Sequence, residues 1–347
     1  MNQILEKIRL KPPEGRLTVE TIDMHTGGEP LRIITGGTGP IEGGTILEKR
    51  RYFRDRLDHI RTGLMFEPRG HADMYGAVIT PPVTEEADFG TFFLHNEGYS
   101  TMCGHAVIAL TKLAVESGMV EKDPETEEIV IDAPPGKIRA RAFIKDGIVE
   151  KVSFRNVPSF LYAKDQTADV SGIGPVPFEV IYGGAFYALC RAEDLDVSLE
   201  GADYNRLIDC GRKIKSAVSQ KLDIRHPFEP DLSFLYGTII TGSARNEHHH
   251  SRNVCVFAEG EVDRSPTGSG VSARAAALYE RGDLALDQTI TIESILGTLM
   301  TVRVIEETEY GPFRAVIPEV SGSASYTGSH RFYFDPDDDL KNGFIFR

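Results

Sequence analysis

The sequence predicts an α/β protein of two similar halves, each with a central helix whose N-terminus faces the other half across a cleft. Three observations lead to this fold class. The chain has 347 residues, more than the roughly 250–300 at which a single core stops growing, so two domains are expected. Short strand patterns recur along the chain and are interrupted by few helices. One helical segment also has a counterpart in the other half.

The first half reads as short strands between glycines and prolines. Apolar and β-branched runs predict strands over residues 17–24, 29–35, 76–80, 90–96, 127–133 and 137–144. An amphipathic stretch at 46–63 predicts one long helix that ends at Gly63, because apolar residues recur there at helical spacing. A second helix is expected to begin near Cys103.

The same pattern starts again after residues 148–160. Strands are expected over 178–184, 185–190, 234–241, 253–257, 289–294, 298–304 and 313–320, and helices over about 202–217 and from about 268. The Asn-Val-Pro turn near 155–160 marks the boundary. Residues 1–155 are therefore expected to form the first domain and residues 156–327 the second.

Two helical segments, MCGHAVIALTKLAVESG and PTGSGVSARAAALYERG, align at a constant offset of 164 residues. Cys103 falls on Thr267, and Gly104 falls on Gly268. Matches over so short a window also arise by chance, and the alternative is a true repeat. In a true repeat, the positive N-terminal ends of both helices would face one cleft and hold a carboxylate there.

The composition argues against several classes of function. Apolar residues make up 41% and charged residues 26% of the chain, as in soluble globular proteins. The net charge of −14 argues against a nucleic-acid or anionic-membrane partner, because phosphate binding needs a basic face. The sequence shows no secretory signal and no membrane-length apolar run, and its four cysteines form no CxxC pair. A cytoplasmic protein with reduced thiols is expected.

Cys103 is the strongest candidate for chemistry. A free thiol has a pKa of about 8.5, and a helix N-terminus is expected to lower that pKa toward neutrality. The thiolate can then act as a nucleophile or as a general base. A buried core cysteine is the alternative, but Gly104 permits close backbone approach and His105 is a polar residue in the first turn. His105 either assists Cys103 or contributes only its backbone N–H, because adjacent helical side chains do not face each other.

Other candidates have structural alternatives of equal or greater weight. Asp263 either holds an amine or caps the turn that leads to Thr267. His25 and His71 lie in glycine-rich loops and are each expected to be structural. The three consecutive histidines at 248–250 cannot all ligate one ion, so a solvated loop is expected there. The sequence contains no Walker loop or dinucleotide-binding fingerprint, so nucleotide cofactors have no support.

Four motifs together resemble the proline racemase family. They are MCGHA at 102–106, DRSPTGSG at 263–270, DMHTGGEPLRI at 23–33 and RGHADMYGA at 69–77, and the resemblance runs from about residue 17 to 347. It implies a fold similar to diaminopimelate epimerase, in which two pseudo-symmetric α/β domains each wrap a barrel-like sheet around a central helix. The active site would lie between the domains, and the C-terminal strand, within 328–347, would cross back to the first domain.

The resemblance also implies roles for individual residues. Racemases of this family have a cysteine at each helix end, one to remove the α-proton and one to return it. This sequence keeps Cys103 but has Thr267 at the second position, which implies dehydration of trans-3-hydroxy-L-proline without a metal or organic cofactor. Cys103 would accept the proton, and Asp263 would bind the ring amine. Further substrate contacts are implied for the backbone N–H groups of Gly104, His105, Gly268 and Ser269 and for the side chains of Tyr75 and Phe257.

Two other functions remain open at this point. A 4-hydroxyproline 2-epimerase or proline racemase would exchange the α-proton with inversion, and Thr267 argues against it because a hydroxyl protonates a carbanion poorly. A non-catalytic amino-acid-binding protein would have no need of the intact Cys103 motif. The sequence also leaves the oligomeric state open, a homodimer included.

Overall fold

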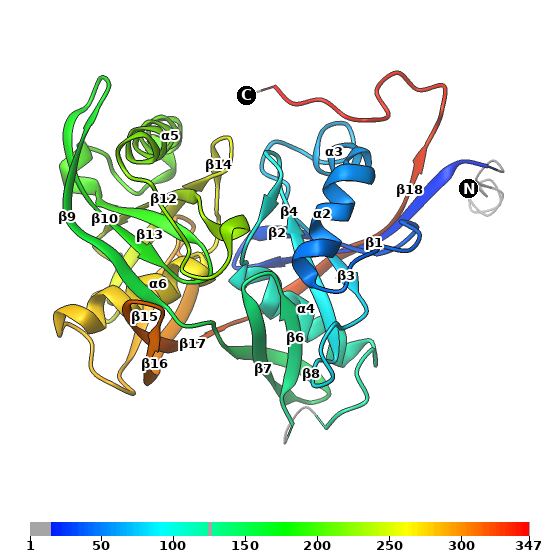
Figure 1. The fold of residues 1–347 in the computed structure, drawn as a ribbon, viewed down its shortest axis with the longest axis horizontal. Coiled ribbons are helices and arrows are strands. Elements are labelled where there is room, and N and C mark those ends of the chain that lie inside the picture. Colours follow the sequence, from blue (N-terminus) through cyan, green and yellow to red (C-terminus); the bar gives the residue numbers. More distant parts are fainter. Residues whose placement is uncertain (1–14, 124–126, 347) are drawn as a thin grey trace, which may run out of the picture.

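The strands form one hydrogen-bonded network around two central helices in the computed structural model, which describes residues 15–123 and 127–346 (Figure 1). The first half surrounds α4 (Gly104–Glu116) with β1 (Leu17–Thr26), β2 (Glu29–Gly36), β3 (Gly76–Thr80), β4 (Phe89–Leu94), β5 (Tyr99–Ser100), β6 (Ile129–Ala133), β7 (Gly136–Lys145) and β8 (Ile148–Arg155). The second half surrounds α6 (Gly268–Arg281) with β9 (Phe160–Val170), β10 (Gly174–Tyr182), β11 (Phe186–Arg191), β12 (Leu235–Gly242), β13 (Ser251–Phe257), β14 (Glu261–Val262), β15 (Thr289–Glu293), β16 (Leu299–Tyr310) and β17 (Phe313–Gly322). A further helix, α5 (Tyr204–Lys221), packs on this second sheet and includes most of the helix expected over 202–217.

The two halves repeat the same order of strand pairings. In the first half, β2 pairs parallel with β3, β3 antiparallel with β4, β4 parallel with β6, and β6 antiparallel with β7. In the second half, β11 pairs parallel with β12, β12 antiparallel with β13, β13 parallel with β15, and β15 antiparallel with β16. The central helices occupy equivalent places, since α4 precedes β6 and α6 precedes β15. The match between the two helix sequences therefore reflects a structural repeat.

Strands near the chain junctions connect the halves. β8 pairs antiparallel with β17, and β9 then continues into the second half and pairs with β10. β18 (Ala324–Phe334) makes the return crossing, because it leaves β17 and pairs antiparallel with β1 over the length of that strand. Figure 1 shows β18, in red, running beside β1, in blue. The domain limits given above, at 155/156 and 327/328, stay a prediction.

Both central helices are enclosed by their sheets. The segment 104–114 of α4 is buried, and its apolar residues occupy all sides of the helix rather than one stripe. The segment 268–278 of α6 is likewise buried and consists largely of alanine, glycine and serine. Small side chains let the surrounding strands pack close to this helix at interior density.

The helix expected over 46–63 is divided into α2 (Ile46–Arg56) and α3 (Asp58–Met65). Leu57 interrupts it with φ −128° and ψ 13°, and the expected stop at Gly63 is wrong because α3 continues past it. Gly63 has a packing role. A Cβ atom there would lie 2.2 Å from Phe334 Cε1 and 2.9 Å from the Lys341 carbonyl oxygen, so glycine lets the C-terminal segment cross the helix closely.

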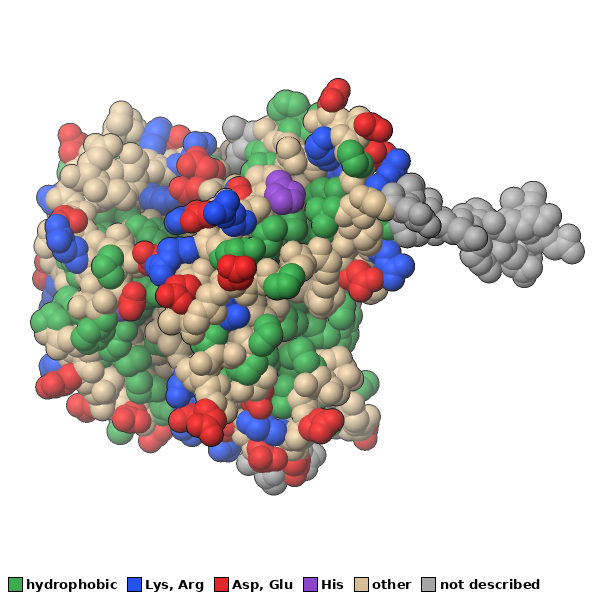
Figure 2. Space-filling view, turned by 45° about the vertical axis from the view of Figure 1, so that its right-hand side comes forward, with side chains coloured by type: hydrophobic (Ala, Val, Ile, Leu, Met, Phe, Trp, Pro, Cys, Tyr) green, Lys and Arg blue, Asp and Glu red, His purple; other side chains and the backbone are tan. Residues whose placement is uncertain are grey.

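The surface carries charges of both signs. Figure 2 shows Lys and Arg interspersed with Asp and Glu over one face of the molecule.

All four cysteines are buried, and none of them is in a disulfide. Among the helices of the described residues, none is both long and apolar enough to cross a bilayer.

Candidate active site

The N-termini of α4 and α6 meet between the two halves. Cys103 directly precedes α4, and Thr267 directly precedes α6. A Cβ atom on Gly104 would lie 2.6 Å from Gly268 Cα, and one on Gly268 would lie 2.8 Å from Gly104 Cα, so only glycine permits this approach. First-turn N–H groups have no acceptor within their own helix. Together with two positive helix ends, they can bind a carboxylate.

A small cavity lies at this junction. Its lining includes every site residue expected from the sequence: Tyr75, Cys103, Gly104, His105, Phe257, Asp263, Thr267, Gly268 and Ser269. Three residues that were not expected complete it: Met102, Tyr187 and Tyr236. The cavity measures about 10 Å³, roughly the space of one water molecule. An amino acid is larger than this cavity, so the cavity must widen before one can enter.

The Cys103 thiol is buried at the end of α4. Its Sγ accepts a hydrogen bond from the Ala106 N–H at 3.3 Å. Burial raises the pKa of the thiol well above its usual value, while the Ala106 N–H opposes this rise by stabilising the thiolate. The expected shift of this pKa toward neutrality is therefore wrong for the closed site, because desolvation outweighs the helix end.

The imidazole of His105 lies against the thiol, with Nδ1 3.2 Å from Cys103 Sγ. Neighbouring helical side chains do not face each other, but Cys103 is the residue before the helix and has extended backbone, with φ −145° and ψ 104°. Burial lowers the pKa of His105 to about 3, so its ring is neutral near pH 7. His105 therefore offers Cys103 a neutral ring nitrogen in addition to the first-turn backbone N–H.

Thr267 has an unusual backbone. Its φ of 70° and ψ of 89° fall in the left-handed region, which a β-branched residue rarely adopts and which costs on the order of 1–3 kcal/mol. Its Oγ1 is buried and makes no hydrogen bond of good geometry within the described residues, although the hydroxyl lies close enough to Asp263 to help lower the pKa of that carboxyl. The strained backbone and the absence of a well-aligned partner for Oγ1 are consistent with a side chain that is positioned for a ligand.

Hydrogen bonds from nearby side chains hold the loop that leads to α6, and with it the backbone of Thr267, in this conformation. The Thr267 N–H donates to Ser265 Oγ at 3.1 Å, and the Asn253 amide donates to the Pro266 carbonyl at 3.1 Å. Arg274 in turn donates to Asn253 Oδ1 at 2.6 Å, which fixes which end of the amide faces the loop. Asn253 thus connects the interior of α6 to the residue next to Thr267.

Replacing Asn253 with alanine is expected to lower the free energy of unfolding by about 2–3 kcal/mol, because it leaves the Pro266 carbonyl and a buried Arg274 N–H without partners. Urea denaturation measures this change. Gln220→Ala is the matched control, since Gln220 is exposed and its side chain donates, among the residues that the structure describes, to Ser216 Oγ, and its effect should stay within about 0.5 kcal/mol. Similar losses in both variants would contradict a supporting role for Asn253.

Asp263 lies beside Thr267 and also belongs to this loop. Its Oδ1 accepts the Ser265 N–H at 2.7 Å, so it caps the turn as well as lining the cavity. Burial raises the pKa of Asp263 to about 6, although the bonds from Ser265 oppose the rise. The buried carboxyl of Glu29 has a pKa raised still more clearly, first by burial and then by Asp263. Near pH 7 Asp263 is therefore mostly anionic, while burial and the charge of Asp263 both disfavour ionisation of Glu29.

Aromatic side chains form the remaining wall of the cavity. The Tyr75 hydroxyl lies 2.5 Å from Ser100 Oγ, and the Tyr187 hydroxyl lies 2.7 Å from Ser269 Oγ. Tyr236 stacks on Phe257 with ring centroids 5.2 Å apart. Tyr187 and Tyr236 stand in strand patterns that read as core, AFYALC and FLYGTIIT. No local signal separates a tyrosine that lines a cavity from one that fills the core.

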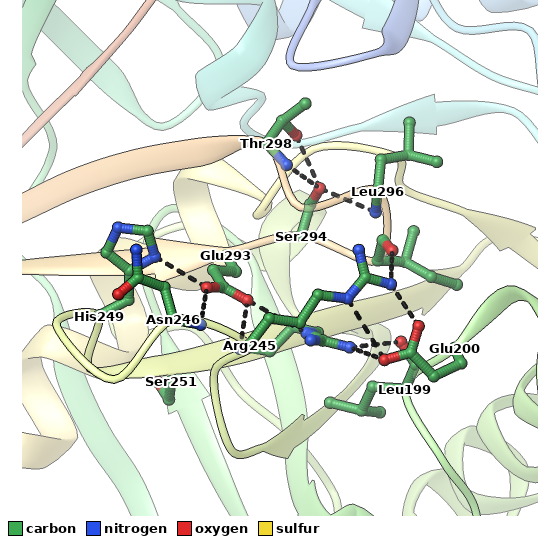
Figure 3. Close-up of polar contacts among 12 residues, drawn as sticks. Leu199, Glu200, Arg245, Asn246, His249, Ser251, Glu293, Ser294, Leu296 and Thr298 are labelled. Atoms are coloured by element: carbon green, nitrogen blue, oxygen red, sulfur yellow. Dashed lines mark hydrogen bonds and ion pairs between the residues drawn. The ribbon is translucent and has the colours of Figure 1, made fainter.

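Three histidines outside the cavity, His25, His71 and His249, contact loop segments. His25 and His71 each accept a backbone N–H through Nδ1, from Gly28 and Asp73 respectively, at 3.2 Å. In the triple-histidine segment, His249 Nδ1 lies 2.8 Å from a carboxylate oxygen of Glu293 (Figure 3). That carboxylate also accepts two backbone N–H groups, from residues 245 and 246. The described residues contain no cluster of three or more potential metal ligands.

The fold and the paired helix ends define a diaminopimelate-epimerase-like protein with a site between its halves. The model of the proline racemase family matches residues 21–345, and the chain belongs to the proline racemase family.

Three known proteins illustrate the similarity. A trans-3-hydroxy-L-proline dehydratase from Colwellia psychrerythraea is 52% identical over 334 residues, covering 96% of this chain and 94% of that protein. A 3-hydroxyproline 2-epimerase from Burkholderia multivorans is 44% identical over 330 residues, covering 95% and 98%. The crystal structure of a hydroxyproline epimerase from Agrobacterium vitis with bound trans-4-hydroxy-L-proline matches with a TM-score of 0.90 at 27% identity, covering 95% of both chains. The expected fold class is confirmed.

Proposed function

We propose that this protein dehydrates trans-3-hydroxy-L-proline to 1-pyrroline-2-carboxylate. The observation that carries the proposal is the unequal pair of helix ends, a thiol at Cys103 facing a hydroxyl at Thr267. The dehydratase relative at 52% identity over nearly the whole chain supports the same reaction. We further expect the protein to work in the cytoplasm without a metal or an organic cofactor.

The substrate carboxylate would bind between the two helix ends. The backbone N–H groups of Gly104 and His105 on one side, and of Gly268 and Ser269 on the other, are the donors. Asp263, which is anionic near pH 7, would hold the ring ammonium. When the halves close, water leaves the site, and both interactions become stronger than in solution.

The Cys103 thiolate then removes the α-proton. Negative charge builds on the carboxylate, where each well-placed N–H donor is worth about 3–4 kcal/mol in favourable cases. The C3–O bond breaks and hydroxide leaves, and the proton taken up by sulfur then neutralises this hydroxide, so one water is lost overall and the Cys103 thiolate is restored. The resulting enamine tautomerises to the cyclic imine. Tyr75 is a candidate contact for the departing hydroxyl.

Thr267 explains why elimination is favoured over inversion. An epimerase must return a proton to the opposite face of the α-carbon, and a threonine hydroxyl is too weak an acid for this step. Elimination needs no second acid or base on that face. The Thr267 hydroxyl can instead donate a hydrogen bond to the substrate or to water.

Epimerisation at C2 is the second candidate, and the relative from Burkholderia multivorans favours it. The two reactions differ in their products. Incubation with trans-3-hydroxy-L-proline and o-aminobenzaldehyde should give the coloured adduct of the cyclic imine, while L-proline and trans-4-hydroxy-L-proline should be recovered unchanged. An absence of adduct together with rapid inversion of any of these substrates would overturn the dehydratase proposal.

The variant Thr267→Cys is expected to gain exchange of the α-proton with inversion, because a second thiol can return a proton to the opposite face. The expected gain is measurable D-isomer from L-proline, where the parent protein gives none above background. Chiral chromatography after incubation measures it. Thr267→Ser is the control, since it keeps a hydroxyl and should not invert the substrate. A folded Thr267→Cys variant without any inversion would count against residue 267 as the determinant.

The pH profile should have two limbs. Asp263 has a pKa of about 6 and must be anionic to hold the ammonium, so kcat/KM should fall about tenfold per unit as the pH drops below that value. Cys103 must be a thiolate, and burial raises its pKa, so kcat should rise from neutral toward alkaline pH. Initial rates between pH 5 and 10 test both limbs. Asp263→Asn should remove the acid limb, and a flat profile for the parent protein would contradict both assignments.

A further inference from the structure

A second cavity lies within the second half, between α6 and the strands β9, β10 and β11. Its volume is about 350 Å³, within the range of about 300–1,000 Å³ typical of small-molecule sites. Phe178, Leu189 and Ala277 contribute apolar surface. The charged lining residues are of both signs: Arg191 pairs with Asp194, Arg281 pairs with Glu179, Asp165 is exposed, and Arg274 is the remaining cation. None of its lining residues lines the cavity at Cys103.

Arg274 is the unusual residue of this cavity. It is only 7% exposed, and Nη1 donates to Ser251 Oγ at 2.8 Å and to Asn253 Oδ1 at 2.6 Å, both neutral groups. Within the described part of the chain, Arg274 forms no ion pair, whereas Arg281 pairs with Glu179 on the same cavity wall. Burial lowers the pKa of Arg274 to about 10, so it remains a cation near pH 7.

A buried cation without an anion is unfavourable, because desolvation of a charge costs several kcal/mol and neutral partners compensate only part of it. The planar guanidinium suits bidentate binding of a carboxylate. We propose that this cavity is a binding site for a small carboxylate, with the anionic head on Arg274 and an apolar body against Phe178 and Leu189. The site is separate from the catalytic one, and the proposal stands whether or not the dehydratase assignment holds.

The protein contains no tryptophan, so a single introduced tryptophan can report on this cavity alone. Phe178→Trp places the reporter in its wall, and 4-bromobenzoate is the probe, because its bromine quenches an indole that it touches. We expect saturable quenching with a half-maximal concentration of about 1 mM or below, as befits a ligand of about ten heavy atoms. The uncharged 4-bromobenzamide should give only linear quenching. Binding of the probe at the catalytic site would not quench this reporter.

Two substitutions of Arg274 test the role of its guanidinium group. In the Phe178→Trp background, Arg274→Met should weaken saturable quenching by about tenfold or more, and Arg274→Lys should retain part of it. Arg274 also donates to Asn253, so its substitution could disturb more than this cavity. Ala277→Leu is a test that leaves the arginine in place. The larger side chain fills part of the cavity and should therefore weaken binding of the probe as well. Linear quenching by 4-bromobenzoate, equal quenching by the amide, or unchanged affinity in folded Arg274→Met or Ala277→Leu would each overturn the proposal.

Discussion

Replacing Cys103 with serine should lower kcat for trans-3-hydroxy-L-proline by about 10³-fold or more. A serine hydroxyl ionises far less readily than a thiol, so the α-proton loses its acceptor, and positioned general bases contribute about 10²–10⁴-fold. The carboxylate contacts come from backbone N–H groups, which the substitution leaves in place. KM should therefore change much less than kcat, and the trapped-imine assay measures both.

Cys210→Ser is the matched control for this experiment. Cys210 is also a buried thiol, but it lies in α5, away from both helix ends. Its substitution should leave kcat within about twofold, since it does not touch the substrate. If Cys103→Ser kept full turnover, or if the two variants lost activity equally, Cys103 would not be the base.

Replacing Gly104 with alanine should lower kcat/KM by about 100-fold or more. The new Cβ would lie 2.6 Å from Gly268 Cα and 2.8 Å from Gly268 C, and these backbone atoms cannot move aside as the end of a flexible side chain could. The two helix ends must then separate, which misplaces the N–H groups on the carboxylate, and misplacement by about 1 Å can cost about 10²-fold. Steady-state kinetics measures this loss.

Gly201→Ala is the control for the glycine experiment. No atom lies within 4 Å of a Cβ built on Gly201, so both stability and kinetics should stay close to those of the parent protein. Thermal unfolding of both variants separates a damaged site from a damaged fold. A folded Gly104→Ala variant with normal kcat/KM would contradict the carboxylate clamp.

Several features of the site could be predicted because they are local in the sequence. A reactive residue followed by glycine at the start of a helix, found at 103 and again at 267, already indicated two converging helix ends. The structure brings these segments together through a repeated order of strand pairings. Features that depend on tertiary contacts were missed. β9 was not predicted, and it pairs with the half opposite to the one that precedes it in the chain. The return of the C-terminal strand was expected only from the family resemblance, and β18 begins at Ala324, before the expected 328.

The chemical state of the site was harder to predict than its position. The spacing rule for helices left open whether His105 would reach Cys103, and it does not apply to the residue before the helix. The helix end suggested an acidic thiol, whereas burial between two domains raises its pKa. Tyr187 and Tyr236 stand in ordinary strand patterns, and only tertiary packing against Ser269 and Phe257 places them at the cavity.

The central claim is that this scaffold eliminates water instead of inverting the α-carbon. NMR spectroscopy of trans-3-hydroxy-L-proline with the protein in deuterated water, with chiral analysis of the remaining substrate, tests it most directly. The expected result is loss of substrate to the cyclic imine, with no C2 epimer of the substrate formed. Accumulation of the deuterated C2 epimer, without the imine, would contradict the account.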